Sequence, residues 1–97
     1  MPKAYVLSCY RSISKPEKLA DYAKLAGPAI AAAGGRFLAR GVAAAAMEDG
    51  LKERTVIIEF DSLEAAQALY NSPLYQEAVQ ALGGDAVVRD MRVIEGV

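Results

Sequence analysis

The chain has 97 residues, which is enough for one hydrophobic core and too few for two, so we expect a single domain over residues 1–97. Apolar residues make up 54% of the chain and charged residues 24%, a balance typical of globular proteins rather than disordered ones. The net charge is −1 and the eleven basic residues are dispersed, which argues against a nucleic-acid-binding surface. No segment has the length and apolarity of a membrane span or a signal region, so we expect no membrane contact and a cytoplasmic location.

The first two predicted elements are a strand and a helix. Residues 4–10 are rich in aromatic and branched side chains and predict a strand. Ser14 and Glu17, on either side of Pro16, have the spacing of a capping box, so a helix should begin there with Ser14 as its N-terminal cap. Apolar residues then recur at helical spacing until Gly34-Gly35, where glycine favours the end of a helix.

The second half of the chain predicts a hairpin, a helical region and a final strand. Residues 36–42 and 54–60 have strand-like composition and flank a polar turn, which indicates an antiparallel hairpin. Asp61-Ser62-Leu63-Glu64 is a capping signal for a second helix, and Ser72 before Pro73 starts a short further helix. Residues 87–94 predict the last strand. The order predicts an α+β fold of the ferredoxin-like βαββαβ type, a four-stranded antiparallel sheet with helices on one face.

One face of such a sheet has no helices to cover it. The segments 5–7 and 56–58 nevertheless place apolar residues on both faces of their strands, which is unusual for a sheet open to water on one side. The simplest cover is a second copy of the chain, so we expect a homodimer in which two sheets form a barrel with room for a small-molecule ligand. A different partner protein on the same face is the alternative.

Several segments resemble the domain of unknown function 1330 family over nearly the whole chain. They are Gly34-Gly35-Arg36-Phe37-Leu38, Val56-Ile57-Ile58-Glu59-Phe60, Ser62-Leu63-Glu64-Ala65-Ala66, Tyr70-Asn71-Ser72-Pro73-Leu74-Tyr75-Gln76 and Glu95-Gly96. The resemblance implies the dimeric α/β-barrel fold and no established activity. Such sequences often carry an arginine shortly after the short third helix, where this chain has Leu82-Gly83-Gly84-Asp85, which puts any anion-binding role of that arginine in doubt.

The absence of histidine removes several chemistries. The chain has no imidazole to serve as a general base or as a haem or zinc ligand, and its single cysteine, Cys9, lies in an apolar run typical of a buried thiol. The glycine pairs lack the lysine and spacing of a phosphate-binding loop. We therefore expect no metal and no cofactor.

Three charged strand residues are candidates for a ligand site. Glu59 lies within an apolar strand, where burial would raise its pKa and make it a proton donor or acceptor; the simpler interpretation is an ion pair with Arg36 or Arg40 across the hairpin. Even spacing places Arg36 and Arg40 on one face of their strand. Facing into the barrel they would bind a carboxylate, and facing outward they would be solubilising charges on an edge strand.

Two residues of the short helix complete the candidate set. Ser72 is a helix cap in its simpler interpretation, and Tyr75 either packs in the core or presents its hydroxyl to a ligand. Two hypotheses follow: a dimeric barrel that binds a small, mainly apolar molecule with an acidic or carbonyl group, with proton transfer by Glu59, or a non-catalytic structural or regulatory module. The resemblance also permits a cofactor-free oxygenase. The sequence alone does not establish an enzyme activity.

Overall fold

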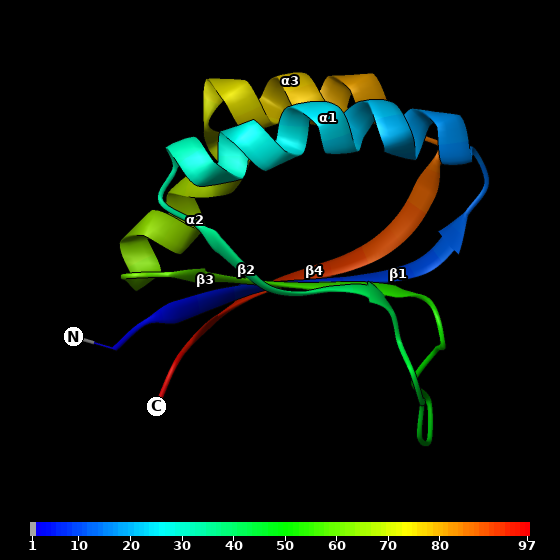
Figure 1. The fold of residues 1–97 in the computed structure, drawn as a ribbon, viewed down its shortest axis with the longest axis horizontal. Helices are drawn as coiled ribbons and strands as arrows, with labels where there is room; N and C mark the ends of the chain where they lie inside the picture. Colours follow the sequence, from blue (N-terminus) through cyan, green and yellow to red (C-terminus); the bar gives the residue numbers. More distant parts are fainter. Residues whose placement is uncertain (1) are drawn as a thin grey trace.

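The computed structural model describes residues 2–97 and contains four strands and three helices (Figure 1). Their bounds are β1 (Ala4–Ile13), α1 (Pro16–Ala32), β2 (Arg36–Val42), β3 (Arg54–Phe60), α2 (Leu63–Asn71), α3 (Pro73–Leu82) and β4 (Val87–Glu95). The predicted βαββαβ order is confirmed, with α2 and α3 together between β3 and β4.

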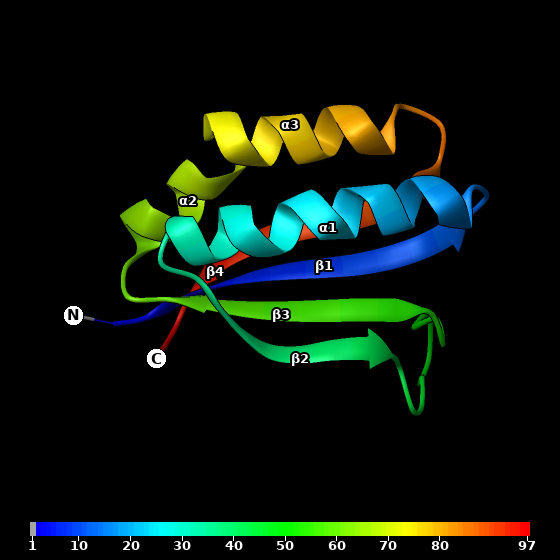
Figure 2. The ribbon, with the colours of Figure 1, turned by 45° about the horizontal axis from the view of Figure 1, so that its top comes forward.

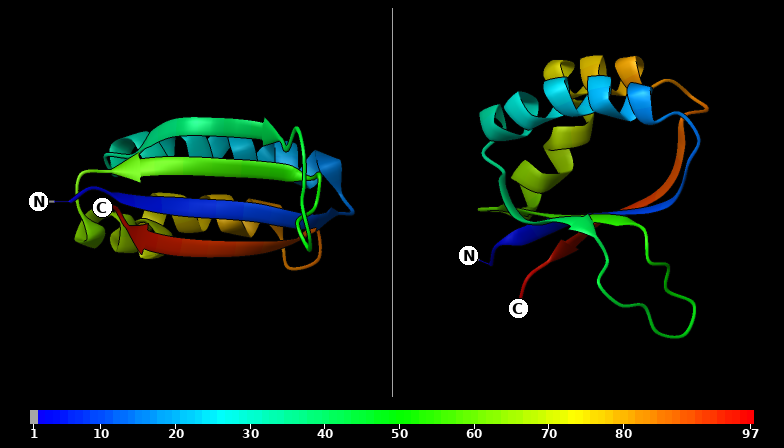
Figure 3. Two further views of the ribbon diagram at one scale, coloured as in Figure 1. Left: turned by 90° about the horizontal axis from the view of Figure 1, so that it is seen from below. Right: turned by 45° about the vertical axis from the view of Figure 1, so that its right-hand side comes forward.

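The four strands form one antiparallel sheet with the order β2-β3-β1-β4, so β2 and β4 are its edges. The helices all cover one face of this sheet, and α1 and α3 run side by side above it (Figures 1 and 2). Seen from the other side, the strands have no helix over them (Figure 3). This arrangement confirms the predicted ferredoxin-like architecture.

The core lies between the helices and the covered face of the sheet. Alternate residues of each central strand point into it: Ala4 and Val6 of β1 are buried, as is Phe60 of β3. Phe60, Leu69 and Tyr75 are the largest fully buried side chains. Burial of a side chain of this size contributes about 1.5–3 kcal/mol before entropy is subtracted, so these three residues are central to holding the helices on the sheet.

Two of the three predicted helix caps are confirmed and one is wrong. Ser62 Oγ accepts a hydrogen bond from the Ala65 amide, and Ser72 Oγ accepts one from the Tyr75 amide. Ser14 does not cap α1: Lys15 is the capping residue, and Ser14 Oγ donates instead to the carbonyl of Asp85 at 2.8 Å. The serine therefore ties the start of α1 to the turn before β4, a long-range contact that local spacing does not reveal.

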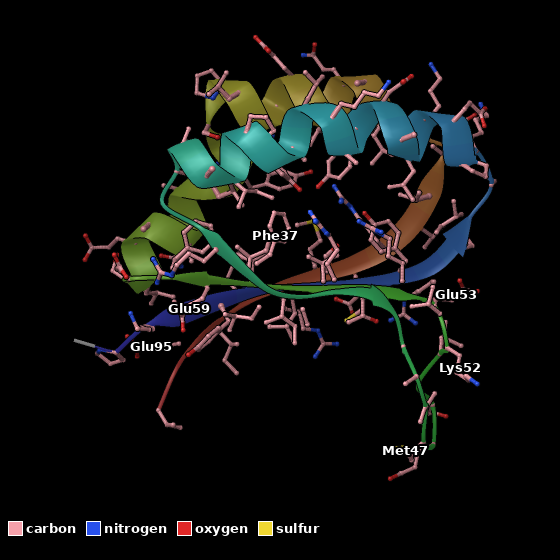
Figure 4. The ribbon with its side chains drawn as sticks, in the orientation of Figure 1. Phe37, Met47, Lys52, Glu53, Glu59 and Glu95 are labelled. Atoms are coloured by element: carbon pink, nitrogen blue, oxygen red, sulfur yellow. The ribbon has the colours of Figure 1, made fainter. Side chains whose placement is uncertain are left out.

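The uncovered face of the sheet is largely apolar in its middle. Tyr5, Leu7 and Ile57 lie half-buried on it, and Ile94 of β4 is 57% exposed. The hairpin loop between β2 and β3 extends on this side, with Met47 at its tip (Figure 4). The bare face predicted from the sequence is thus present, while the homodimer proposed to cover it stays a prediction. None of the helices in residues 2–97 is long and apolar enough to cross a membrane.

Candidate functional site

Two of the predicted site residues meet on the uncovered face. Arg36 of β2 lies opposite Glu59 of β3, and its Nε and Nη2 atoms donate to Glu59 Oε1 at 3.1 and 3.0 Å. Tyr5 donates to the other carboxylate oxygen at 3.3 Å, and Arg36 Nη2 also bonds Asp61 at 2.9 Å. Glu59 (Figure 4) is therefore a paired carboxylate, the simpler of its two sequence-based interpretations.

Arg40 lies on the opposite face from Arg36, so the expectation that the two share a face is wrong. The register of β2 shifts between Phe37 and Ala39, and this irregularity turns the rest of the strand over. Arg40 lies opposite the buried Val56 and places its guanidinium carbon 4.3 Å from the ring centre of Phe37, on the helix side of the sheet (Figure 4). The two arginines cannot bind one carboxylate together.

The two candidates at the start of the short helix also differ: Ser72 has a structural role, and Tyr75 lies in the interior. Ser72 joins α2 to α3: its Oγ donates to the carbonyl of Leu69 at 2.8 Å while capping α3. Tyr75 is 1% exposed and points between the helices and the sheet. The five candidates are therefore divided between two faces of the sheet and a helix junction.

Tyr75 belongs to a cluster of three tyrosines and one arginine in the interior, which we call the Arg89 cluster: Tyr10, Tyr22, Tyr75 and Arg89. The hydroxyls of Tyr22 and Tyr75 hydrogen bond to each other, and their rings meet edge to face at 6.0 Å. Arg89 of β4 donates to the Tyr10 hydroxyl at 3.2 Å and lies 3.5 Å from that of Tyr75. Its guanidinium carbon is 4.8 Å from the ring centre of Tyr22.

The cluster contains a cation and no anion. Burial raises the pKa of Tyr75, so its phenol is neutral at physiological pH and cannot compensate a charge. In the part of the chain that the structure describes, no carboxylate forms an ion pair with Arg89. A half-buried guanidinium that contacts only neutral phenols and aromatic rings retains donor capacity for an anionic ligand.

Arg89 also lines a groove of about 700 Å³ between helices α2 and α3 and the edge strand β4. The groove is mainly apolar, and its walls include Leu69, Val79, Leu82, Met91 and Val93. Its other charged residue, Arg92, is already paired with Asp90 at 3.0 Å. The volume is that of a small-molecule pocket, with Arg89 as its unpaired charge. No group of residues suited to a metal ion occurs within residues 2–97.

Sequence reasoning missed Tyr10, Tyr22 and Arg89 as site residues, although a signal for Arg89 was available. It alternates along β4 with Met91 and Val93, which pair with the buried-face residues Ser8 and Val6 of β1. A charged residue in phase with the core-facing positions of a strand is unusual, because an uncompensated charge there is costly. Such a residue indicates either a buried ion pair or a binding site.

Comparisons place the chain within a family and a fold. The model of the family described as Domain of unknown function (DUF1330) matches residues 3–97. A protein of unknown function from Rhodopseudomonas palustris is 24% identical, with a TM-score of 0.70 over 97% of this chain and 80% of that one. A putative antibiotic biosynthesis monooxygenase from Caulobacter crescentus is 15% identical, with a TM-score of 0.63 over 99% and 91% of the two chains.

A nipsnap family protein of unknown function from Agrobacterium tumefaciens is 18% identical, with a TM-score of 0.58 over 99% of this chain and 89% of that chain. Comparison with curated proteins gives no significant match. At these identities the solved structures establish the fold alone. Since the family model covers nearly the whole sequence, the chain belongs to the DUF1330 family.

Proposed function

We propose that the protein binds a small organic acid, whose acidic group contacts Arg89 and whose apolar part fills the groove between α2, α3 and β4. The observation that carries the proposal is the unpaired, half-buried guanidinium of Arg89 in the wall of an apolar groove of about 700 Å³. Pockets of this kind combine apolar lining with a few polar groups that orient the ligand. A planar guanidinium suits a carboxylate because it offers parallel donors.

The phenols of the Arg89 cluster support this role by fixing the arginine. Tyr10 accepts from Nη1, while the ring of Tyr22 lies beneath the guanidinium carbon. These contacts hold the side chain without neutralising it, because a phenol carries no charge near pH 7. An arginine held in place loses less conformational entropy when the ligand binds.

The test is a matched pair of probes, 4-phenylbutanoate and 4-phenylbutanol, titrated by protein-observed NMR. We expect the acid to shift resonances along the groove and to bind about tenfold more tightly or better than the alcohol, since a hydrogen bond to a charged group contributes about 1.5–3 kcal/mol. Arg89→Met should remove the preference for the acid. Arg36→Met, the same change on the uncovered face, should leave it unchanged.

Equal binding of the two probes to the wild type would remove Arg89 from recognition. No binding of either probe would favour the alternative, a non-catalytic structural or regulatory module. Glu59 lies across the sheet from the groove, so proton transfer by Glu59 would require a ligand held against the uncovered face.

The homodimer is a second part of the proposal, supported by the apolar character of the uncovered face. Ile94 is 57% exposed there, beside the half-buried Tyr5 with which it pairs. Apolar surface of this kind is normally covered by a partner. We expect a dimer by sedimentation at micromolar concentration, and Ile94→Asp should dissociate it.

Leu74 supplies the matched control for the dimer, because it is 51% exposed but lies on α3, on the helical side. Leu74→Asp introduces the same charge and should leave the dimer intact. A wild-type protein that remains monomeric at about 100 μM, or a dimer lost equally in both variants, would contradict the assignment of this face.

A further inference from the structure

A second and much smaller cavity lies on the other side of the Arg89 cluster. It has a volume of about 30 Å³ and lies beneath α1, against the covered face of the sheet. Its lining includes Ser8, Tyr10, Arg40, Arg54 and Tyr75. The cavity and the groove are distinct spaces, because their linings have only Met91 in common.

Two residues that line the cavity each have a buried polar atom without a hydrogen-bond partner. Ser8 is only 4% exposed, and its Oγ atom has no partner within the described residues. The Nε atom of Arg54 is likewise buried and unpaired there. A buried donor left unsatisfied typically costs about 1–3 kcal/mol, and more when the group is charged. Two residues with such atoms in the lining of one cavity favour an occupant that accepts hydrogen bonds.

The charge of the lining favours an anion over water. Arg40 and Arg54 both line the cavity, whereas no Asp or Glu does. The ion pairs found among residues 2–97 use other cations, and neither of these two arginines takes part in one. Arg54 and Arg89 also lie on the ring of Tyr10, at 5.9 and 5.7 Å from its centre. A water molecule would satisfy hydrogen bonds but leave the charge of the half-buried Arg54 without a counterion.

We propose that this cavity binds one small inorganic anion of about the size of chloride, held by Arg54 Nε and Ser8 Oγ. The cavity is large enough for one or two water-sized groups, which admits a monatomic anion and excludes an organic acid with an apolar body. Both proposed contacts are hydrogen-bond donors, and Arg40 adds positive charge at the margin of the site. The site is independent of the organic acid proposed for the groove.

The experiment compares thermal unfolding of the full chain in sodium chloride and in sodium gluconate at one ionic strength. Gluconate is too large for the cavity and controls for general salt effects. A ligand that binds only the native state stabilises it by RT ln(1 + [L]/Kd), so we expect chloride at about 100 mM to raise Tm by about 3 °C or more over gluconate. Broadening of the ³⁵Cl NMR signal by the protein should reach saturation over the same concentration range.

Variants assign the effect to the cavity. Arg54→Met should abolish both the chloride-dependent rise in Tm and the ³⁵Cl broadening, and Ser8→Ala should weaken them. Arg36→Met removes an arginine from the uncovered face and should change neither. Since the ³⁵Cl measurement on wild type and on Ser8→Ala does not need the Arg54 variant, a failure of Arg54→Met to fold leaves the test intact.

Equal Tm in chloride and gluconate, together with no saturable ³⁵Cl broadening, would overturn the proposal and identify the cavity as water-filled. Chloride binding that survives both Arg54→Met and Ser8→Ala would place the anion elsewhere. Neither result would affect acid binding in the groove, because that depends on Arg89 and is measured with different probes.

Discussion

The hydrogen bond between Tyr22 and Tyr75 predicts a strong energetic coupling between the two residues. Tyr22 is 8% exposed and Tyr75 is 1% exposed, so water cannot replace a phenol that is removed. Tyr75→Phe leaves the Tyr22 hydroxyl buried without that partner, and Tyr22→Phe does the same to Tyr75. Each single change should lower the free energy of unfolding by about 1.5 kcal/mol, within the range for a buried unsatisfied group.

The double variant should cost less than the two single changes added together. With both phenols replaced, the Tyr22–Tyr75 hydrogen bond is lost without leaving either member of that pair unsatisfied. Its net contribution is about 1 kcal/mol, so we expect a loss of about 1 kcal/mol for the double variant against a sum of about 3. The coupling energy is therefore about 2 kcal/mol, well above the deviation seen for independent sites.

Urea unfolding followed by circular dichroism measures all four proteins, at one protein concentration because association would shift the midpoint. Tyr70→Phe is the matched control: its ring lies 5.7 Å from that of Tyr75, but Tyr70 is 47% exposed. We expect that change to cost less than about 0.5 kcal/mol. Additivity of the Tyr22 and Tyr75 changes within about 0.3 kcal/mol would refute the coupled pair.

Two further predictions concern the glycine after α1 and the alkaline titration. A Cβ atom at Gly35 would lie 2.7 Å from a side-chain carbon of Ile30, so Gly35→Ala should cost about 1–3 kcal/mol in urea unfolding, whereas Gly41→Ala, with nothing within 4 Å, should cost less than about 0.5. A loss of equal size at the two positions would contradict this packing. The pKa of Tyr75 is raised in the folded state. The free energy of unfolding that this shift contributes is therefore fully present below the unfolded pKa of about 10 and is lost progressively as the pH rises above it. The urea midpoint of wild type should accordingly fall more steeply above pH 10 than that of Tyr75→Phe, and parallel pH profiles would count against it.

The fold was predictable because its signals are local and agree with one another. Ser62 and Ser72 both cap the helices that follow them, and the strand segments 36–42 and 54–60 pair as expected. The apolar residues at successive positions of the central strands correctly indicated that the uncovered face of the sheet is apolar in its middle. Each of these inferences depends on residues close together in the chain or on simple alternation.

The candidate site was less predictable because an irregularity and long-range contacts determine it. The register shift after Phe37 separates Arg36 from Arg40, and nothing in the strand composition specifies where such a shift occurs. The Arg89 cluster joins residues from β1, α1, α3 and β4, which meet only in the folded chain. Alternation along β3 and β4 would still have shown Arg54 and Arg89 to be in phase with core residues.

The arginines on the two faces of the sheet differ in whether carboxylates compensate their charge. This contrast argues that Arg89 serves binding rather than stability. On the uncovered face, Arg36 is matched by the carboxylates of Glu59 and Asp61. On the helix side, Arg89 has only neutral partners. Replacing a poorly compensated buried cation with an apolar side chain of similar length is often neutral or stabilising.

We therefore expect Arg89→Met, measured without ligand, to be as stable as wild type to within about 1 kcal/mol or to exceed it. The same variant should lose its preference for an organic acid, because the groove then holds no unpaired charge. Urea unfolding and probe titration on one sample measure both quantities. A loss of more than about 2 kcal/mol would show instead that the guanidinium is a structural member of the tyrosine cluster, since stability would then depend on the contacts that we assign to preorganisation of the binding site.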